Sequence, residues 1–128
     1  MGKTLICLAV LATSLAAAEE SVQLPDVEVV ELRAVREKGQ ILIDGFLVSH
    51  RREPIRGLRI KIDLLDSDGK LLSERQTEIT DDLIEAGDEI PFSLAARGQA
   101  RVISLRVDVF NAKKSPLLAA GVGPYLIE

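Results

Sequence analysis

The sequence has very few residues of the kinds that carry catalysis and metal binding. It contains one cysteine, one histidine, one methionine and no tryptophan among 128 residues. Copper handling needs clusters of histidine and methionine, and a serine hydrolase needs a histidine base beside its nucleophile. The single histidine, His50, is not accompanied by a Gly-x-Ser-x-Gly motif anywhere in the chain. We therefore expect no enzyme activity, no cofactor and no bound metal.

Aromatic residues and excess positive charge are also lacking. Aromatic side chains make up only 3% of the sequence, which is too few for stacking platforms that bind bases or sugars. The chain carries 16 basic and 20 acidic residues, whereas general nucleic-acid binding needs a basic surface. Nucleic acid is therefore not an expected partner.

The first 18 residues have the plan of a cleavable secretory signal peptide. Lys3 provides a positive start, an apolar run extends from Leu5 to Leu15, and three alanines ending at Ala18 precede Glu19. The alternative is a short membrane anchor, but this run is well below the roughly 20 residues that span a bilayer. We expect cleavage after Ala18 and a periplasmic or secreted protein with no stable membrane span.

Cleavage at this site would remove the only cysteine, Cys7, which lies inside the apolar run. It would also remove Lys3, so the charge of the remaining chain becomes 15 − 20 = −5. The exported domain then has no disulfide and no thiol chemistry. Its core alone must hold it, which is feasible because a chain of this size buries roughly 65% of its unfolded surface.

A β-hairpin is predicted between Ile55 and Leu72. Apolar residues occupy every second position from Leu58 to Leu64, which is typical of a strand with one buried face. The sequence from Asp66 to Gly69 ends in Asp-Gly, a strong hairpin signal. The long first arm is expected to lie at the centre of a sheet.

Further strands are predicted on both sides of this hairpin. They cover residues 26–35, 41–48, 73–79, 90–94, 103–109 and 118–126, and 80–88 is expected to form a crossover loop. Residues 26–35 change which face is apolar, which suggested a strand that crosses between two sheets. About seven strands at intervals of about ten residues, without helices between them, favour an antiparallel immunoglobulin-like β-sandwich over residues 26–128, after a polar tether at 19–25. The expected core comprises Leu58, Ile60, Ile62, Leu64, Phe92, Ile103, Leu105, Val107 and Val109.

Several runs occur in the order seen in one domain family. They are Ile43-Asp-Gly-Phe-Leu-Val-Ser49, Pro54-Ile-Arg-Gly-Leu58, Ile62-Asp-Leu-Leu-Asp-Ser-Asp-Gly-Lys-Leu-Leu72, Leu83-Ile-Glu-Ala-Gly87 and Ile90-Pro-Phe92. Together they resemble an FxLYD-type domain over residues 27–111, although Leu65 stands where an aromatic is usual and Ala86 where proline is usual. The resemblance implies an exported bacterial immunoglobulin-like module and no catalytic residues. The sandwich of desiccation-associated LEA-14 domains is a more distant analogy.

Three polar segments are candidate ligand sites. His50 lies beside Arg51 and Arg52, which could contact a small anion or could form a solvated loop. Asp66 and Asp68 resemble the start of a calcium loop, but the later ligand positions of such a loop are missing, so a hairpin turn explains them better. The acidic segment 81–85 could hold calcium weakly or could be a solvated loop.

Two surfaces are candidate partner-binding sites. The predicted central strands place Arg59, Lys61 and Asp63 beside Arg106 and Asp108 on an outward face. The last predicted strand, 118–126, has no charge and lacks the usual protection of a sheet edge, so a partner or a second copy could pair with it near Val122. The expected function is a non-catalytic module that binds or helps assemble another envelope or secreted protein; the alternative is a passive structural or stress-protective domain.

Overall fold

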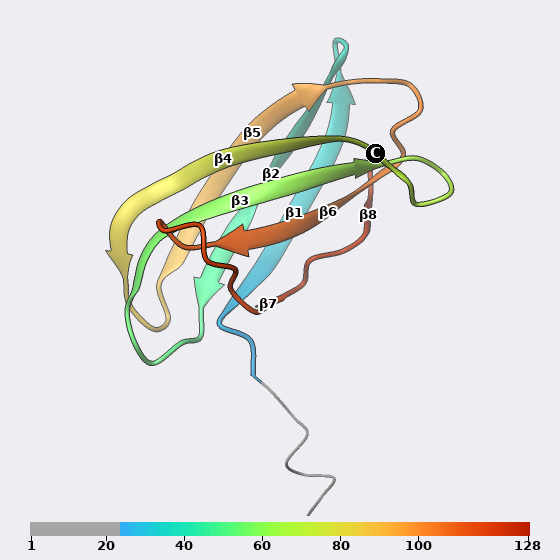
Figure 1. Cartoon of the computed structure of the whole chain (residues 1–128). Coiled ribbons are helices and arrows are strands. Elements are labelled where there is room, and N and C mark those ends of the chain that lie inside the picture. The colour runs from blue at the N-terminus through green and yellow to red at the C-terminus, as the bar shows by residue number, and fades with distance from the viewer. Residues whose placement is uncertain (1–23) are drawn as a thin grey trace, which may run out of the picture.

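The computed structural model describes residues 24–128, so the predicted signal peptide and most of the tether lie outside the described residues. This part of the chain forms eight strands (Figure 1). In chain order they are β1 Val27–Glu37, β2 Gln40–Ser49, β3 Ile55–Leu65, β4 Leu71–Ile84, β5 Glu89–Arg97, β6 Ser104–Phe110, β7 Ala119–Ala120 and β8 Tyr125–Leu126.

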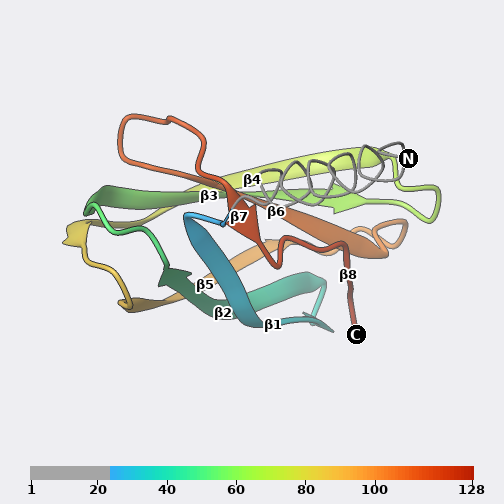
Figure 2. The ribbon, with the colours of Figure 1, turned by 90° about the horizontal axis from the view of Figure 1, so that it is seen from below.

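The strands form two four-stranded sheets that lie one above the other (Figure 2). Sheet A has the order β5-β2-β1-β7, and sheet B has the order β4-β3-β6-β8. The first, second and fifth strands share one sheet and the third and sixth the other, as in immunoglobulin domains. The predicted all-β immunoglobulin-like sandwich is therefore confirmed.

The predicted hairpin is present, and β3 is an interior strand of sheet B between β4 and β6. Its turn is closed by the backbone amide of Asp66, which donates to the carbonyl of Lys70 over 3.0 Å. The Asp66 carboxylate accepts two further bonds of 2.9 Å, from the amides of Asp68 and Lys70. This tight turn explains why β4 follows β3 into sheet B, since a hairpin keeps its two arms in one sheet.

The core lies between the sheets and consists almost wholly of aliphatic side chains. The predicted core residues are buried, with one exception: Ile103 is 42% exposed, whereas its neighbour Val102 is fully buried. The prediction began this strand one residue too early. Strand β6 begins at Ser104, and the chain before it does not follow the period of two that places Leu105 and Val107 inside.

Strand β1 contains a β-bulge, which corrects the prediction that it crosses between sheets. β1 pairs with β2 along its whole length, but Glu31 and Leu32 together stand opposite the single residue Gly45. Glu31 has a φ of 53°, so the bulge adds one residue to the strand. The added residue shifts the buried positions from Val27 and Val29 to Ala34, which is the change of face seen in the sequence.

Gly45 lies where the bulge of β1 and the ring of Phe92 on β5 converge. A Cβ atom on Gly45 would lie 3.0 Å from Cζ of Phe92 and 3.2 Å from the Cα of Leu32. Glycine is therefore needed at this position, because the Phe92 ring takes the space that a side chain would occupy.

Strand β4 is longer than predicted. It runs to Ile84 and remains paired with β3 as far as Ile55, so residues 80–84 are strand and not loop. The crossover to β5 takes only four residues, and Gly87 adopts the left-handed φ of 87° that this tight connection requires. The aspartates at 81 and 82 had favoured a loop in the prediction, because strands are usually poor in aspartate.

The predicted C-terminal strand, 118–126, is wrong as a single element. The chain instead pairs briefly with β1 as β7 and then with β6 as β8, and so passes from sheet A to sheet B. Glycines at 121 and 123 with positive φ allow this change of direction. Finally Glu128 bonds to β1 again: its amide donates to Ala34 and its carbonyl accepts from Arg36, over 2.9 and 3.0 Å.

Val122 lies inside this crossing segment. Its side chain packs against the core, and its carbonyl accepts a 2.9 Å bond from the amide of Val107. The segment thus closes one side of the sandwich and offers no continuous edge for a partner at Val122. The long open edges are β4 and β5 on the other side, where Glu74 and Arg75 on β4 and Pro91 on β5 oppose further pairing.

Within residues 24–128, no helix has the length and apolar character needed to cross a bilayer.

Replacement of Ile62 by Asp should prevent folding. Ile62 and its cross-strand partner Val107 are both fully buried, so the carboxylate would have no partner. Such a group costs several kcal/mol, which is comparable with the roughly 5–15 kcal/mol that stabilises a domain. Circular dichroism of the purified variant should show loss of cooperative melting. A soluble variant with a cooperative transition would show that this pair is not at the core.

Replacement of Gly45 by Val should destabilise the domain by about 1–3 kcal/mol, because the new side chain would overlap the ring of Phe92. Urea unfolding of G45V, F92L and the double variant would measure this. The shorter Leu side chain should relieve part of the crowding, so the cost of G45V should be smaller in the F92L background. Equal costs in both backgrounds would mean that the ring does not set the requirement for glycine.

Candidate functional site

The outward side chains of β3, β4 and β6 form one surface, which we call the charged face. The predicted neighbours are confirmed: Lys61 pairs in register with Asp108, and Asp63 pairs with Arg106. Strand β4 adds a third row that sequence reasoning missed. The charged face comprises Arg59, Lys61 and Asp63 on β3, Glu74, Gln76 and Glu78 on β4, and Arg106 and Asp108 on β6.

The hairpin turn alone does not predict this row. A tight turn sets the register of its two arms, and an unbroken count outward from the pair of Leu65 and Leu71 would bring Ser73 opposite Asp63. One irregularity next to the turn, between Leu64 and Leu65, shifts this count by one residue and so brings Glu74 opposite Asp63 and Glu78 opposite Arg59. Both glutamates also protect the open edge of β4 from further strand pairing.

Ion pairs link the three strands across the charged face. The Lys61 Nζ atom lies 3.9 Å from a Glu74 carboxylate oxygen and 3.8 Å from one of Asp108. Arg59 Nη1 lies 3.7 Å from a Glu78 carboxylate oxygen. Pairs of this kind at a surface contribute about 0–1 kcal/mol each. A partner with its own charges could therefore replace them at little cost.

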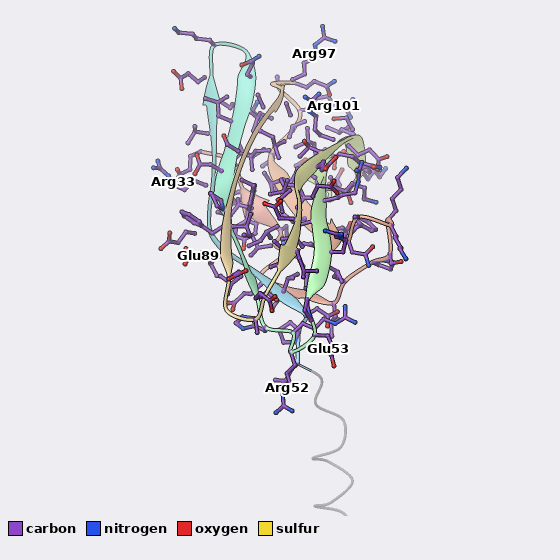
Figure 3. All side chains as sticks on the ribbon, turned by 90° about the vertical axis from the view of Figure 1, so that its left-hand side faces the viewer. Arg33, Arg52, Glu53, Glu89, Arg97 and Arg101 are labelled. Carbon is purple, nitrogen blue, oxygen red and sulfur yellow. The ribbon has the colours of Figure 1, made fainter. Side chains whose placement is uncertain are left out.

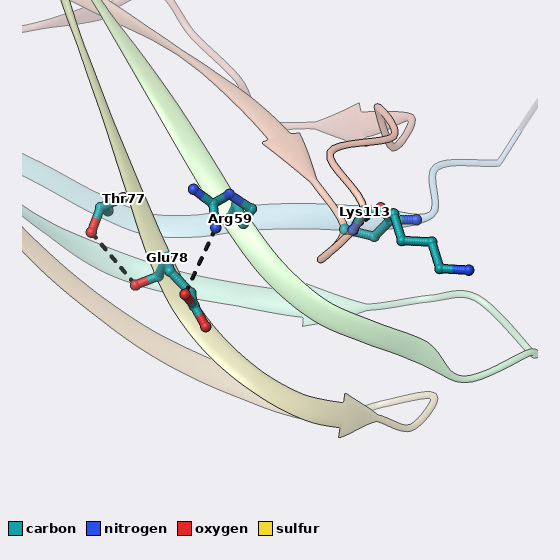
Figure 4. Close-up of polar contacts among 5 residues, drawn as sticks. Arg59, Thr77, Glu78 and Lys113 are labelled. Carbon is teal, nitrogen blue, oxygen red and sulfur yellow. Dashed lines mark hydrogen bonds and ion pairs between the residues drawn. The ribbon is translucent and has the colours of Figure 1, made fainter.

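Arg59 stands between two shallow hollows at one end of the charged face. One, of about 200 Å³, is lined by Arg59, Glu78, Thr80, Asp81 and Ala112. The other, of about 220 Å³, is lined by Arg59, Ile60, Lys61, Gln76, Phe110 and Lys114. The turn after β6 contributes a wall to both. In Figure 4 Arg59 reaches toward Glu78, and Lys113 extends from that turn.

The turn after β6 is held in place by Asn111. Its side-chain oxygen accepts two hydrogen bonds of 3.0 Å, from the amides of Lys113 and Ser115. Gly57 on β3 lets the turn approach closely, since its φ is 72° and a Cβ there would lie 2.8 Å from the Cβ of Ala112. The hollows beside Arg59 therefore have a fixed wall.

Asp63 is the residue of the charged face whose ionised carboxylate lies in an unfavourable environment. One of its carboxylate oxygens is buried without a hydrogen-bond partner among the described residues. Burial raises the pKa of Asp63, and the nearby carboxylates of Asp108 and Glu74 raise it further, while Lys61 and Arg106 oppose the shift. A partner that donates a hydrogen bond to this carboxylate would satisfy the buried oxygen.

The side chains of the other candidate ligand segments have partners within the domain. His50 Nε2 lies 2.9 Å from a Glu28 carboxylate oxygen, and Arg51 Nε lies 3.6 Å from one of Glu53. An anion at this loop would have to compete with these carboxylates. The backbone amides at the β3–β4 turn, chiefly that of Lys70, lower the pKa of Asp66. That carboxylate therefore serves the turn.

The acidic residues at 81, 82 and 85 do not gather into a site. Residues 81 and 82 belong to β4, and the amide of Asp82 donates to Thr80 Oγ1 over 3.1 Å. The amide of Glu85 is capped by the Asp88 carboxylate over 2.8 Å. Within residues 24–128, no group of three or more His, Cys, Asp or Glu residues is placed to hold a metal ion.

The sequence matches no protein-family model and has no significant match among curated proteins. The resemblance to FxLYD-type domains therefore stays a prediction.

Solved structures resemble the fold. A β-glucuronidase from glycoside hydrolase family 2 matches 73% of this chain with a TM-score of 0.50 and 8% identity. The β-glucuronidase of Bacteroides uniformis matches 73% with a TM-score of 0.48 and 18% identity. IrmA from Escherichia coli matches 80% of this chain and 95% of its own, with a TM-score of 0.49 and 15% identity. The chain spans only 12% of the length of either glucuronidase. At such identities the likeness concerns the fold alone.

Replacement of Asp63 by Asn should make the domain more stable at neutral pH. A raised pKa in the folded state means that folding disfavours the ionised carboxylate, so stability is lost as the pH rises through that pKa. The gain from D63N should shrink as the pH falls below the ordinary pKa of aspartate. Thermal melting of the wild type and D63N across this range would measure it. D108N is the matched control: it removes one carboxylate that raises the pKa of Asp63 but also removes a 3.8 Å partner of Lys61, so it should stabilise the domain less than D63N does. A loss of stability in D63N at neutral pH would contradict the prediction.

Proposed function

We propose that this chain is a non-catalytic exported module that binds another envelope or secreted protein through its charged face. The observation that carries the proposal is the meeting of Arg59, Lys61, Asp63, Arg106 and Asp108 on the two adjacent strands β3 and β6, with β4 beside them. Export is supported by the leader pattern at residues 1–18.

The form of the charged face favours a protein over a small ligand. Its two hollows measure about 200 and 220 Å³, below the roughly 300–1,000 Å³ that is typical of small-molecule pockets. It also carries both signs of charge on backbone that is fixed by the core beneath it. A mixed pattern of this kind specifies a partner by complementary charge and steers its approach.

Photo-crosslinking in the cell envelope would test the proposal. A photoreactive amino acid in place of Gln76 would lie in the middle of the charged face, on the exposed side of β4. We expect one discrete adduct with a second protein. The matched control replaces Arg52, which is also exposed but lies in the β2–β3 loop at the end of the sandwich.

Charge reversal should remove the adduct. Lys61→Glu places three carboxylates together at the centre of the charged face, and so should reduce crosslinking from position 76 at least about tenfold. Equal crosslinking from positions 76 and 52, or no loss with K61E, would reject the charged face as the binding surface. Absence of any adduct would favour a passive structural or stress-protective domain.

A further inference from the structure

The outer side of sheet A is unusually apolar for a surface that faces away from the core. Its outward residues lie in rows across β1, β2 and β5, and two of these rows are entirely apolar. One row contains Val30, Phe46 and Pro91, and the other contains Val35, Leu42 and Ala95. We call these two rows, together with the row between them, the apolar face.

The residues of these two rows are half-buried by their neighbours, except Pro91, which is exposed. An antiparallel sheet with one wet side normally alternates apolar and polar residues, as sheet B does with its charged face. A contiguous apolar patch on an outer surface marks an interaction site. Sheet A therefore has a second side suited to burial.

The row between the two apolar rows carries one charge of each sign. Arg33 on β1 stands opposite Asp44 on β2, followed by Ser93 on β5. Both charged side chains are exposed, and neither makes an ion pair within 4 Å among residues 24–128. In Figure 3 Arg33 points away from the sandwich on the sheet A side. The centre of the apolar face thus holds an acid and a base that both lack an ionic partner.

We infer that the apolar face binds a second copy of this chain. Consider a two-fold axis that runs along the strands, midway between β1 and β2. Each β1 then faces the β2 of the other copy, so Arg33 of each copy meets Asp44 of the other. The same operation sets Val30 against Phe46 and Val35 against Leu42. A surface whose charges and apolar rows match themselves in this way is self-complementary, as a two-fold interface requires.

The size of the apolar face predicts a weak dimer. The two-fold axis sets only β1 and β2 of the two copies against each other; two strands about 4.8 Å apart, each nine residues long at about 3.3 Å per residue, give a footprint of roughly 300 Å². A standard interface buries roughly 800 Å² on each partner. Association should therefore depend on concentration.

The ends of the apolar face disfavour a membrane as its occupant. A lipid surface attracts basic residues around an apolar patch. Here the row beyond Val30 carries Glu28 and Glu89, and the row beyond Val35 carries Glu37 and Arg97. Three acids to one base at these ends would be repelled by anionic headgroups.

Sedimentation equilibrium over roughly a hundredfold range of protein concentration would test the inference. We expect a monomer–dimer equilibrium for the wild type. Arg33→Asp should raise the dissociation constant at least about tenfold, because it sets two carboxylates against each other at both symmetric contacts. The charge swap R33D/D44R should restore most of the affinity. Phe46→Lys should abolish the dimer by placing a charge among the apolar rows.

Arg52→Asp is the matched control, since it makes the same change of charge in the β2–β3 loop at the end of the sandwich (Figure 3). It should leave the dissociation constant unchanged. A wild type that stays monomeric throughout, a dimer that R33D does not weaken, or a swap that fails to recover affinity would each overturn the inference. A monomer that still forms the adduct from position 76 would leave the proposed partner-binding function standing.

Discussion

Burial of the inner face of β3 is the constraint on which the rest of the structure depends. Its side chains at 58, 60, 62 and 64 are each at most 2% exposed, and its backbone is paired on both sides, with β4 and β6. Each fully buried aliphatic side chain contributes about 1.5–3 kcal/mol. The part of the chain that the structure describes contains no cysteine, so these contacts must do the work that disulfides perform in many exported domains. The charged side chains between these positions belong to the charged face, and they are consequently held on rigid backbone.

The bulge in β1 has a similar effect on sheet A. By adding one residue opposite Gly45, it returns Leu32 and Ala34 to the core side after Val27 and Val29. The same shift brings Arg33 into line with Asp44. Without the extra residue these two charges would not share a row, and the apolar rows on either side would not be continuous. A local irregularity of the backbone thus decides the composition of a whole outer surface.

The two outer surfaces of the sandwich differ in how their charges are satisfied. On sheet B, Lys61 and Arg59 have carboxylates within 4 Å, and charged residues occupy every strand of the charged face. On sheet A, one pair of opposite charges lies between apolar rows without an ion pair of its own in the described part of the chain. The proposed roles follow from this contrast. On the charged face, ion pairs within the domain can be replaced by ion pairs with another protein. The apolar face carries one acid and one base in the same row, so it can associate with the same face of a second copy.

Much of the fold could be predicted from the sequence, because period-two alternation and turn signals act locally. The alternation over 58–64 and 105–109 predicted two strands and their buried sides, and Asp-Gly at 68–69 predicted the hairpin, all of which the structure confirms. The neighbouring positions of Lys61 and Asp108 also followed from that pattern combined with the immunoglobulin-like order. Only the tertiary structure decided the role of β4 in the charged face, the bulge that aligns Arg33 with Asp44, and the division of the last predicted strand between two sheets. Register, bulges and the choice of sheet depend on contacts between residues that are distant in the chain, and a local pattern does not contain that information.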